Sequence, residues 1–142
     1  MQKRLLLVVL ALAAGIQGVV PAPSRAAGAR MTSDQLLDYA FRNHRGQFVI
    51  EGQGTVIKLL PDDLKAPRHQ RFLVRLRSGQ VLLVAHNIDL ARRVAGLRAG
   101  TVIQFKGEYE WTAKGGVIHW THRDPQSRHA PGWLKYAGVI YQ

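Results

Sequence analysis

The chain has 142 residues, a formal net charge of +11 at pH 7 and no cysteine. The absence of cysteine excludes disulfide bonds, thiolate metal ligands, a cysteine nucleophile and a lipoprotein anchor. The positive charge favours association with polyanions such as nucleic acid, acidic glycans or an anionic membrane surface, and it carries no information about activity.

The first 29 residues are predicted to be a cleaved signal peptide. Lys3 and Arg4 precede an apolar run from Leu5 to Ala14, and Ala27-Gly28-Ala29 supplies the small residues that a signal peptidase requires. The alternative is an uncleaved membrane anchor, but a run of about ten apolar residues is only half of the roughly twenty that span a bilayer. We therefore expect an exported protein, periplasmic or secreted, whose residues 30–142 carry 17 basic and 9 acidic side chains, a net charge of +8.

Residues 30–46 are predicted to contain one amphipathic helix. Thr32 or Ser33 offers a hydroxyl group for the N-cap, and Gly46 ends the segment. Apolar residues recur at the i, i+3, i+4 spacing that places them on one face of a helix. These residues are Leu36, Leu37, Ala40 and Phe41. We therefore expect a helix ahead of the strands.

Residues 47–122 alternate apolar and polar side chains with period two, which is typical of strands. The first segment, 48–60, is long for one strand, and Gly52 and Gly54 permit a bend near its middle. A hairpin is expected next, with its turn at Ser78-Gly79. The remaining strands are expected at 101–111 and 117–122.

Residues 89–100, between the third and fourth strands, have helical character. Leu90, Val94 and Leu97 fall on one side of such a helix, and Asp89 is placed to cap it. Five strands, a bend in the first and this short helix predict a mainly β fold, a small five-stranded Greek-key barrel of the oligonucleotide/oligosaccharide-binding (OB) type. The barrel domain is expected to span 47–142, with a C-terminal hairpin that turns at Gly138.

An arginine-rich strand face is the first candidate binding site. Arg71, Arg75 and Arg77 alternate along the second strand and point away from Phe72, Val74 and Leu76. Barrels of this type commonly bind single strands or sugars across the second and third strands. Basic side chains together with aromatic stacking surfaces are what single-stranded nucleic acid requires. We expect Trp111 and Trp120 to supply the stacking, with single-stranded nucleic acid, an oligosaccharide or another polyanion as the ligand.

Histidines concentrate near the C-terminus and suggest a divalent metal such as zinc. The candidate ligands are His86, His119, His122, Asp124 and His129. Zinc needs three or four ligands in a tetrahedral array, and these spacings match no established zinc motif. His119 and His122 point to opposite faces if the strand stays regular as far as His122. The alternative for each histidine is a local hydrogen bond at the end of a strand or in a loop.

Other catalytic patterns are weak, so the sequence favours a binding protein over an enzyme. There is no G-x-S-x-G motif. Glu108 and Glu110 share a strand face about 7 Å apart, a spacing that could serve acid–base catalysis but that also suits exposed glutamates. Two alternatives remain open: a metal-dependent hydrolase or nuclease that uses the histidines, and a structural envelope or partner-binding protein.

The chain resembles a family of exported bacterial proteins known as domain of unknown function three thousand four hundred and sixty-five. The resemblance covers most of the chain from Gly52 onward and rests on a set of short motifs. They are "RHQRFLV" (68–74), "AHNIDLA" (85–91), "GEYEW" (107–111), "GGVIHWTHRDP" (115–125), His129, Gly132-Trp133 and the terminal "YQ". The resemblance implies an exported single domain, and it supplies no activity and no catalytic residues.

Overall fold

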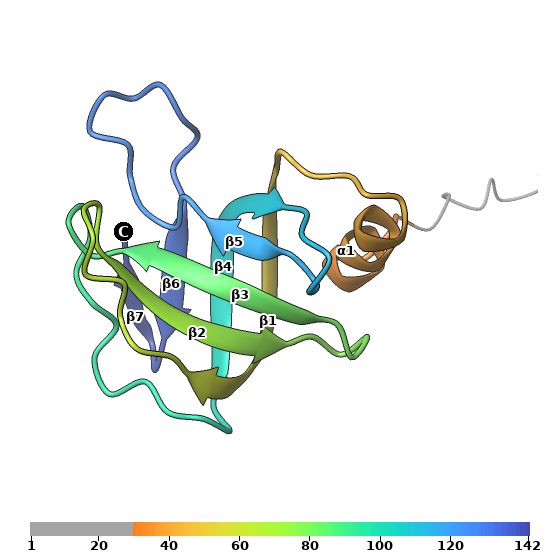
Figure 1. Ribbon diagram of the computed structural model, residues 1–142, viewed down its shortest axis with the longest axis horizontal. Helices are drawn as coiled ribbons and strands as arrows, with labels where there is room; N and C mark the ends of the chain where they lie inside the picture. Colours follow the sequence, from red (N-terminus) through yellow and green to blue (C-terminus); the bar gives the residue numbers. More distant parts are fainter. Residues whose placement is uncertain (1–29) are drawn as a thin grey trace, which may run out of the picture.

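The computed structural model describes residues 30–142 (Figure 1). The predicted signal peptide, residues 1–29, lies outside the described residues, so its cleavage after Ala29 stays a prediction. Within residues 30–142, no helix combines the length and the hydrophobicity needed to cross a bilayer.

The helix α1 (Ser33–Arg42) is the N-terminal helix expected from the sequence. Thr32 is its N-cap and forms a capping box with Gln35, because the Thr32 hydroxyl accepts from the Gln35 backbone amide and the Gln35 side chain accepts from the Thr32 amide. Leu37 and Ala40 are the buried residues of the helix and belong to the core. The helix packs against one side of the strands (Figure 1).

Replacing Thr32 by alanine is expected to lower the free energy of unfolding by about 1 kcal/mol, because the Gln35 amide loses its acceptor at the helix start. Thr32→Ser keeps the hydroxyl group and is the matched control. Urea denaturation of the two variants checks the prediction. Equal losses in both variants would show that the methyl group, and not the cap, matters.

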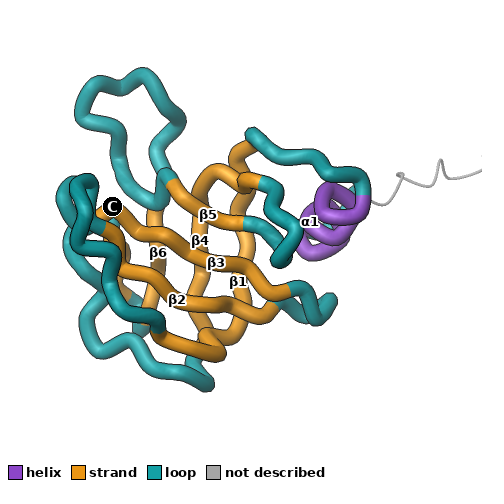
Figure 2. The backbone as a smooth tube through the Cα atoms, in the orientation of Figure 1, coloured by secondary structure: helices purple, strands orange, loops and turns teal. Residues whose placement is uncertain are grey.

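Five strands close into the barrel predicted from the sequence. They are β1 (Phe48–Leu59), β2 (His69–Arg75), β3 (Val81–Asn87), β4 (Val102–Glu110) and β5 (Val117–His119). Their order around the barrel is β1-β2-β3-β5-β4, and β1 pairs with β4 to complete it (Figures 1 and 2). All of these pairs are antiparallel except β3 with β5. This arrangement is consistent with an OB-fold-like barrel.

The bend in β1 is what allows the barrel to close. Its first part, Phe48 to Thr55, pairs with β4, and its last part, Thr55 to Leu59, pairs with β2. A Cβ atom at Gly54 would lie 2.4 Å from the Val74 side chain and 2.7 Å from the Arg75 carbonyl oxygen. The glycine therefore permits the close strand approach at the bend, as the sequence predicted.

Two more strands form the predicted C-terminal hairpin. They are β6 (Trp133–Tyr136) and β7 (Val139–Tyr141), and Ala137 and Gly138 in the turn both have positive φ. β5 pairs with β4 over Glu108 to Glu110, whereas β6 pairs with β4 over Gln104 to Lys106. The loop 120–132 therefore leaves the barrel where β5 ends and returns where β6 begins (Figure 2).

The core fills the interior of the barrel with the inward side chains of each strand. Alternation along β4 is as predicted, because Ile103, Phe105 and Tyr109 are buried while Gln104 is exposed. The other large, fully buried apolar side chains of the strands are Val56, Phe72, Val74, Leu82, Val84, Ile118 and Leu134.

The expected helix at 89–100 is wrong. Between β3 and β4 the chain forms turns, with Gly96 at φ +64°. Buried Gln70 binds both the amide and the carbonyl group of Val94, which fixes that residue to β2 instead of to a helical turn. Asp89 accepts from the backbone amide and the guanidinium group of Arg68, both at 2.7 Å, so it is not a helix cap.

The fifth strand is shorter than predicted. β5 ends at His119, and not at His122, because Trp120 adopts a positive φ of 53°. The backbone turns there, so Thr121 and His122 are both buried. The strand alternation expected from Val117 to His122 therefore does not apply beyond His119.

Candidate functional site

Two neighbouring cavities form a groove along the bent strand β1. The smaller cavity, of about 280 Å³, has apolar contributions from Ile57 and Val102 and is flanked by Arg75 and Arg77. Among residues 30–142, neither of these arginines forms an ion pair, and both are exposed. This end of the groove therefore offers two free positive charges beside an apolar floor.

The larger cavity, of about 820 Å³, lies between the start of α1 and the outer side of β1 and β4. It shares Gln53 and Arg77 with the smaller cavity. Gln53 pairs across the sheet with Gln104, and Trp133 of β6 lies opposite Lys106 on β4. The remaining charged side chains in its lining are Asp34, Asp38 and Glu51. The larger cavity thus combines an indole, three amides and three carboxylates with one arginine.

Arg71, the third arginine expected on the binding face, has an internal partner. Its guanidinium group donates to the Pro61 carbonyl oxygen through Nε at 3.1 Å and Nη2 at 3.0 Å. Trp111 is also engaged: its indole nitrogen donates to the Phe41 carbonyl oxygen at 2.9 Å, and its ring packs against the core and His44. Trp111 therefore ties α1 to the barrel.

Trp120, the second tryptophan expected to stack on a ligand, stacks on a histidine. Its ring lies 4.3 Å from the His129 ring with an interplanar angle of 8°. His122 lies near the same indole, with 5.2 Å between ring centroids. Trp120 therefore links the end of β5 to the far side of the loop 120–132.

His86 is a core residue in this structure. It is fully buried, and its two ring nitrogens contact the Thr121 hydroxyl at 2.8 Å and the Arg92 carbonyl oxygen at 3.0 Å. Burial lowers the pKa of His86 to about 4, although the contact with Arg92 acts in the opposite direction. With both nitrogens occupied, the ring ties β3 to the chain beyond β5 and has no free ligand atom.

His122 and Asp124 form hydrogen bonds within the loop 120–132. His122 is buried, and its Nδ1 contacts the Arg123 carbonyl oxygen at 2.8 Å. The Asp124 carboxylate accepts from the backbone amides of Gln126, Arg128 and His129. These three contacts hold the pKa of Asp124 below its usual value, with the Gln126 contact the largest cause. Asp124 is thus an internal cap of the loop.

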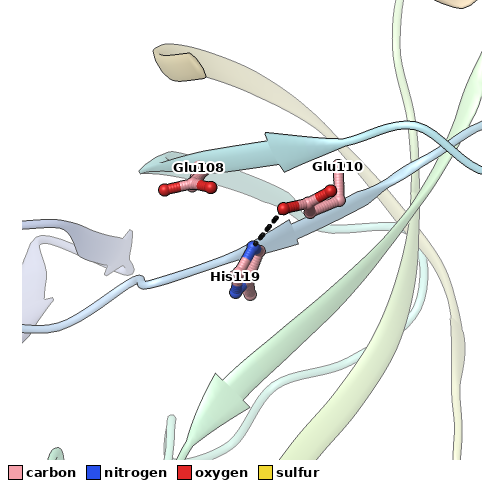
Figure 3. Close-up of side chains that lie close together, drawn as sticks. All are labelled: Glu108, Glu110 and His119. Atoms are coloured by element: carbon pink, nitrogen blue, oxygen red, sulfur yellow. Dashed lines mark ion pairs between the residues drawn. The ribbon is translucent and has the colours of Figure 1, made fainter. Parts of the chain in front are cut away.

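His119 lies in a cluster with two glutamates (Figure 3), and His129 contacts one of them. Glu108 and Glu110 project from β4, and His119 of β5 lies opposite Glu108 in the sheet. One ligand atom from each of Glu108, Glu110 and His119 lies within 4.8 Å of the others. His129 reaches the cluster from the loop 120–132, with its Nε2 2.5 Å from a Glu108 oxygen. We call these four residues the histidine–carboxylate cluster.

The two histidines of the cluster differ in their protonation. Burial lowers the pKa of His119, although Glu108 and Glu110 act in the opposite direction. Burial alone would also lower the pKa of His129, but the contacts with Glu108 and the Ala130 carbonyl outweigh it and raise that pKa. At neutral pH we therefore expect a neutral His119 beside a His129 that retains its proton more strongly.

These features define a small closed β-barrel of the OB type with an open groove on one side and a histidine–carboxylate cluster. The chain belongs to the family described as "Protein of unknown function (DUF3465)", which it matches over residues 19–142. This match confirms the family expected from the sequence motifs. No curated protein is significantly similar to the chain.

Sequence reasoning offered Trp133 only as one of several stacking surfaces and did not place it in one groove with Gln53 and Gln104. Trp133 stands in the motif Gly132-Trp133, and only the pairing of β6 with β4 shows that it shares a surface with the two glutamines. The pairing of Glu108 with His119 likewise depends on the register between β4 and β5. Alternation along β4 had already placed both glutamates on one face, which was the available signal.

Proposed function

We propose that the protein is a binding module for an oligosaccharide that carries at least one anionic group. The observation that carries the proposal is the groove in which the free Arg75 and Arg77 adjoin a cavity lined by Trp133, Gln53 and Gln104. OB-type barrels commonly bind oligonucleotides or oligosaccharides on their open faces. The volume of about 820 Å³ is in the range of sites that hold small ligands.

The chemistry of the lining favours a sugar over a nucleic acid. Amide side chains donate to and accept from hydroxyl groups, carboxylates accept from them, and an indole packs against the apolar face of a sugar ring. Single-stranded nucleic acid instead needs a positive groove that follows a regularly charged backbone. The larger cavity instead presents Asp34, Asp38 and Glu51, of which Asp38 and Glu51 are paired with Arg42 and Lys106, so it has no continuous positive charge for a phosphate at each step. One anionic unit at the Arg75–Arg77 end meets a single carboxylate, Asp34, which accepts from the Arg77 backbone amide at 2.9 Å, and two guanidinium groups outweigh it.

The proposed compartment is consistent with this ligand. The apolar segment and the small-residue motif in residues 1–29 predict export, and an exported protein meets envelope or extracellular glycans. We therefore propose that the module acts in the periplasm or after secretion.

Titration of the full chain with a xylotriose that carries one glucuronic acid unit, followed by calorimetry and tryptophan fluorescence, tests the proposed function. We expect Trp133→Ala to weaken binding about tenfold, since stacking on an aromatic ring contributes on the order of 1 kcal/mol. The double variant Arg75→Gln/Arg77→Gln is expected to remove the preference for this singly charged sugar over neutral xylotetraose. The matched control is Arg123→Gln/Arg128→Gln, which removes the same charge from the exposed loop 120–132.

An equal loss in the control double variant would show that net charge alone drives the association. Tighter binding of a twelve-nucleotide single-stranded DNA, with a steep dependence on salt, would replace the sugar by a nucleic acid as the ligand. Unchanged affinity in Trp133→Ala would place the site away from the larger cavity.

A further inference from the structure

We propose that Glu108, Glu110 and His119 bind one divalent cation of the zinc type, with His129 as the residue that orients Glu108. Imidazole and carboxylate groups are common zinc ligands, and a site with three protein ligands leaves one position for water or an exogenous group. The cluster shares no residue with the lining of the groove, so the inference goes beyond the proposed function and stands apart from it.

Glu108, Glu110 and His119 lie near one another on the adjoining strands β4 and β5 (Figure 3). The three ligand atoms lie within 4.8 Å of one another, whereas atoms around a tetrahedral zinc ion are roughly 3.3 Å apart, given bonds of about 2.0 Å. Rotation of the two flexible glutamate side chains can close this difference without moving the strands. The pairing of β4 with β5 fixes Glu108 and His119 opposite each other, so the backbone already holds two ligands together.

The strongest independent observation is the unsatisfied nitrogen of His119. Its Nε2 atom is buried and has no hydrogen-bond partner within the described chain. The nearest carboxylate oxygen, from Glu110, is 3.6 Å away, which is too far for a hydrogen bond. Leaving a buried polar atom unpaired is unfavourable, so such atoms are rare in folded proteins. A cation between His119 and the two carboxylates would satisfy this nitrogen and offset both negative charges.

His129 is placed to hydrogen-bond to a metal ligand, Glu108, without binding the metal itself. Its Nε2 contacts Glu108 at 2.5 Å, and its Nδ1 contacts the Ala130 carbonyl oxygen at 2.8 Å. Because both nitrogens face acceptors, the ring is a donor on both sides and is not itself available to the metal. Stacking on Trp120, the residue that follows β5, fixes the plane of the His129 ring. Partners of this kind keep a ligating carboxylate in its binding orientation.

The test is calorimetric titration of the full chain with zinc chloride after chelator treatment and dialysis, with metal analysis of the dialysed product. We expect about one zinc ion per chain and a rise in the melting temperature on zinc addition. Glu110→Gln and His119→Gln are each expected to weaken zinc binding at least about 100-fold, and His129→Gln about 10- to 100-fold. Magnesium is expected to give no saturable binding, because an imidazole ligand favours zinc.

His44→Asn is the matched control, since it removes an exposed histidine outside the cluster, and asparagine tolerates the positive φ of that position. Zinc binding that is absent, or that is as strong in Glu110→Gln as in the unmodified chain, would overturn the proposal. A loss in His44→Asn equal to that in His119→Gln would also overturn it. Glu110 is partly exposed, so its variant is expected to fold even if His119→Gln does not, and the proposal then rests on that variant.

Discussion

Acidification from pH 7 to pH 4 is expected to remove about 3 kcal/mol of stability through His86 alone. The pKa of this group is about 4 in the folded protein and 6.5 when the chain is unfolded. Between these two pH values, the unfolded chain binds a proton at His86 and the folded chain does not. The contribution is therefore complete above about pH 6.5 and is lost progressively as the pH falls toward 4. Urea denaturation at several pH values measures it.

The variant His86→Gln isolates this contribution from the other titrating groups. His119, whose pKa is also lowered, acts in the same direction, whereas His129, whose pKa is raised, adds stability at low pH. Both proteins contain His119 and His129, so the contributions of these two histidines cancel in the difference in free energy of unfolding between the unmodified chain and His86→Gln. We expect that difference to shrink as the pH falls from 7 to 4. A difference that is constant over this range would contradict the assignment of His86 as a neutral core residue.

Replacing Gly132 by alanine is expected to lower the free energy of unfolding by about 3 kcal/mol. The new Cβ atom would lie 1.9 Å from the Trp120 carbonyl oxygen and 2.7 Å from the Lys106 carbonyl oxygen. Both obstacles are backbone atoms, which cannot rotate away, so the loop 120–132 must separate from β4. Thermal and urea denaturation measure the loss.

Ala130→Ser is the control for this substitution, because it adds one heavy atom to an exposed position of the same loop. Its stability is expected to stay within about 0.5 kcal/mol of the unmodified chain. Separation of the loop also moves His129, so Gly132→Ala is expected to weaken the contact with Glu108. Equal stability of Gly132→Ala and Ala130→Ser would contradict the prediction, because it would show that the backbone can shift to make room for a Cβ atom where Gly132 passes Trp120.

The barrel was predictable from the sequence because its signals are local. Period-two alternation identified the strands, and Gly52 and Gly54 marked the bend in β1. The segment 89–100 shows where local signals fail. Its apolar spacing fits a helix, but Gln70 and Arg68, about twenty residues earlier, bind Val94 and Asp89 and hold the chain in turns. Such long-range hydrogen bonds leave no trace in the spacing of apolar residues.

The sequence predicted which kinds of residue form the candidate sites better than it predicted which individual residues belong to them. Histidine density pointed to the segment 115–136, yet only His119 and His129 join the glutamates of β4. His86 and His122 look the same in the sequence and are used inside the fold. The distinction depends on the register of β4 with β5 and on the positive φ at Trp120, and neither is encoded in a short motif.

β5 and β6 pair with the same edge of β4, one after the other, so the chain can be cut between them into two fragments. The loop 120–132 connects two strands on one continuous sheet edge, and its exposed residues 125–127 can vary in length and sequence without altering the closure of the barrel. A cut at exposed Pro125 to Ser127 would leave a fragment that ends beyond β5 and a short fragment that contains only β6 and β7. The short piece would rejoin by adding its strand to the vacant half of the β4 edge. The fold is thus a natural scaffold for complementation between two fragments.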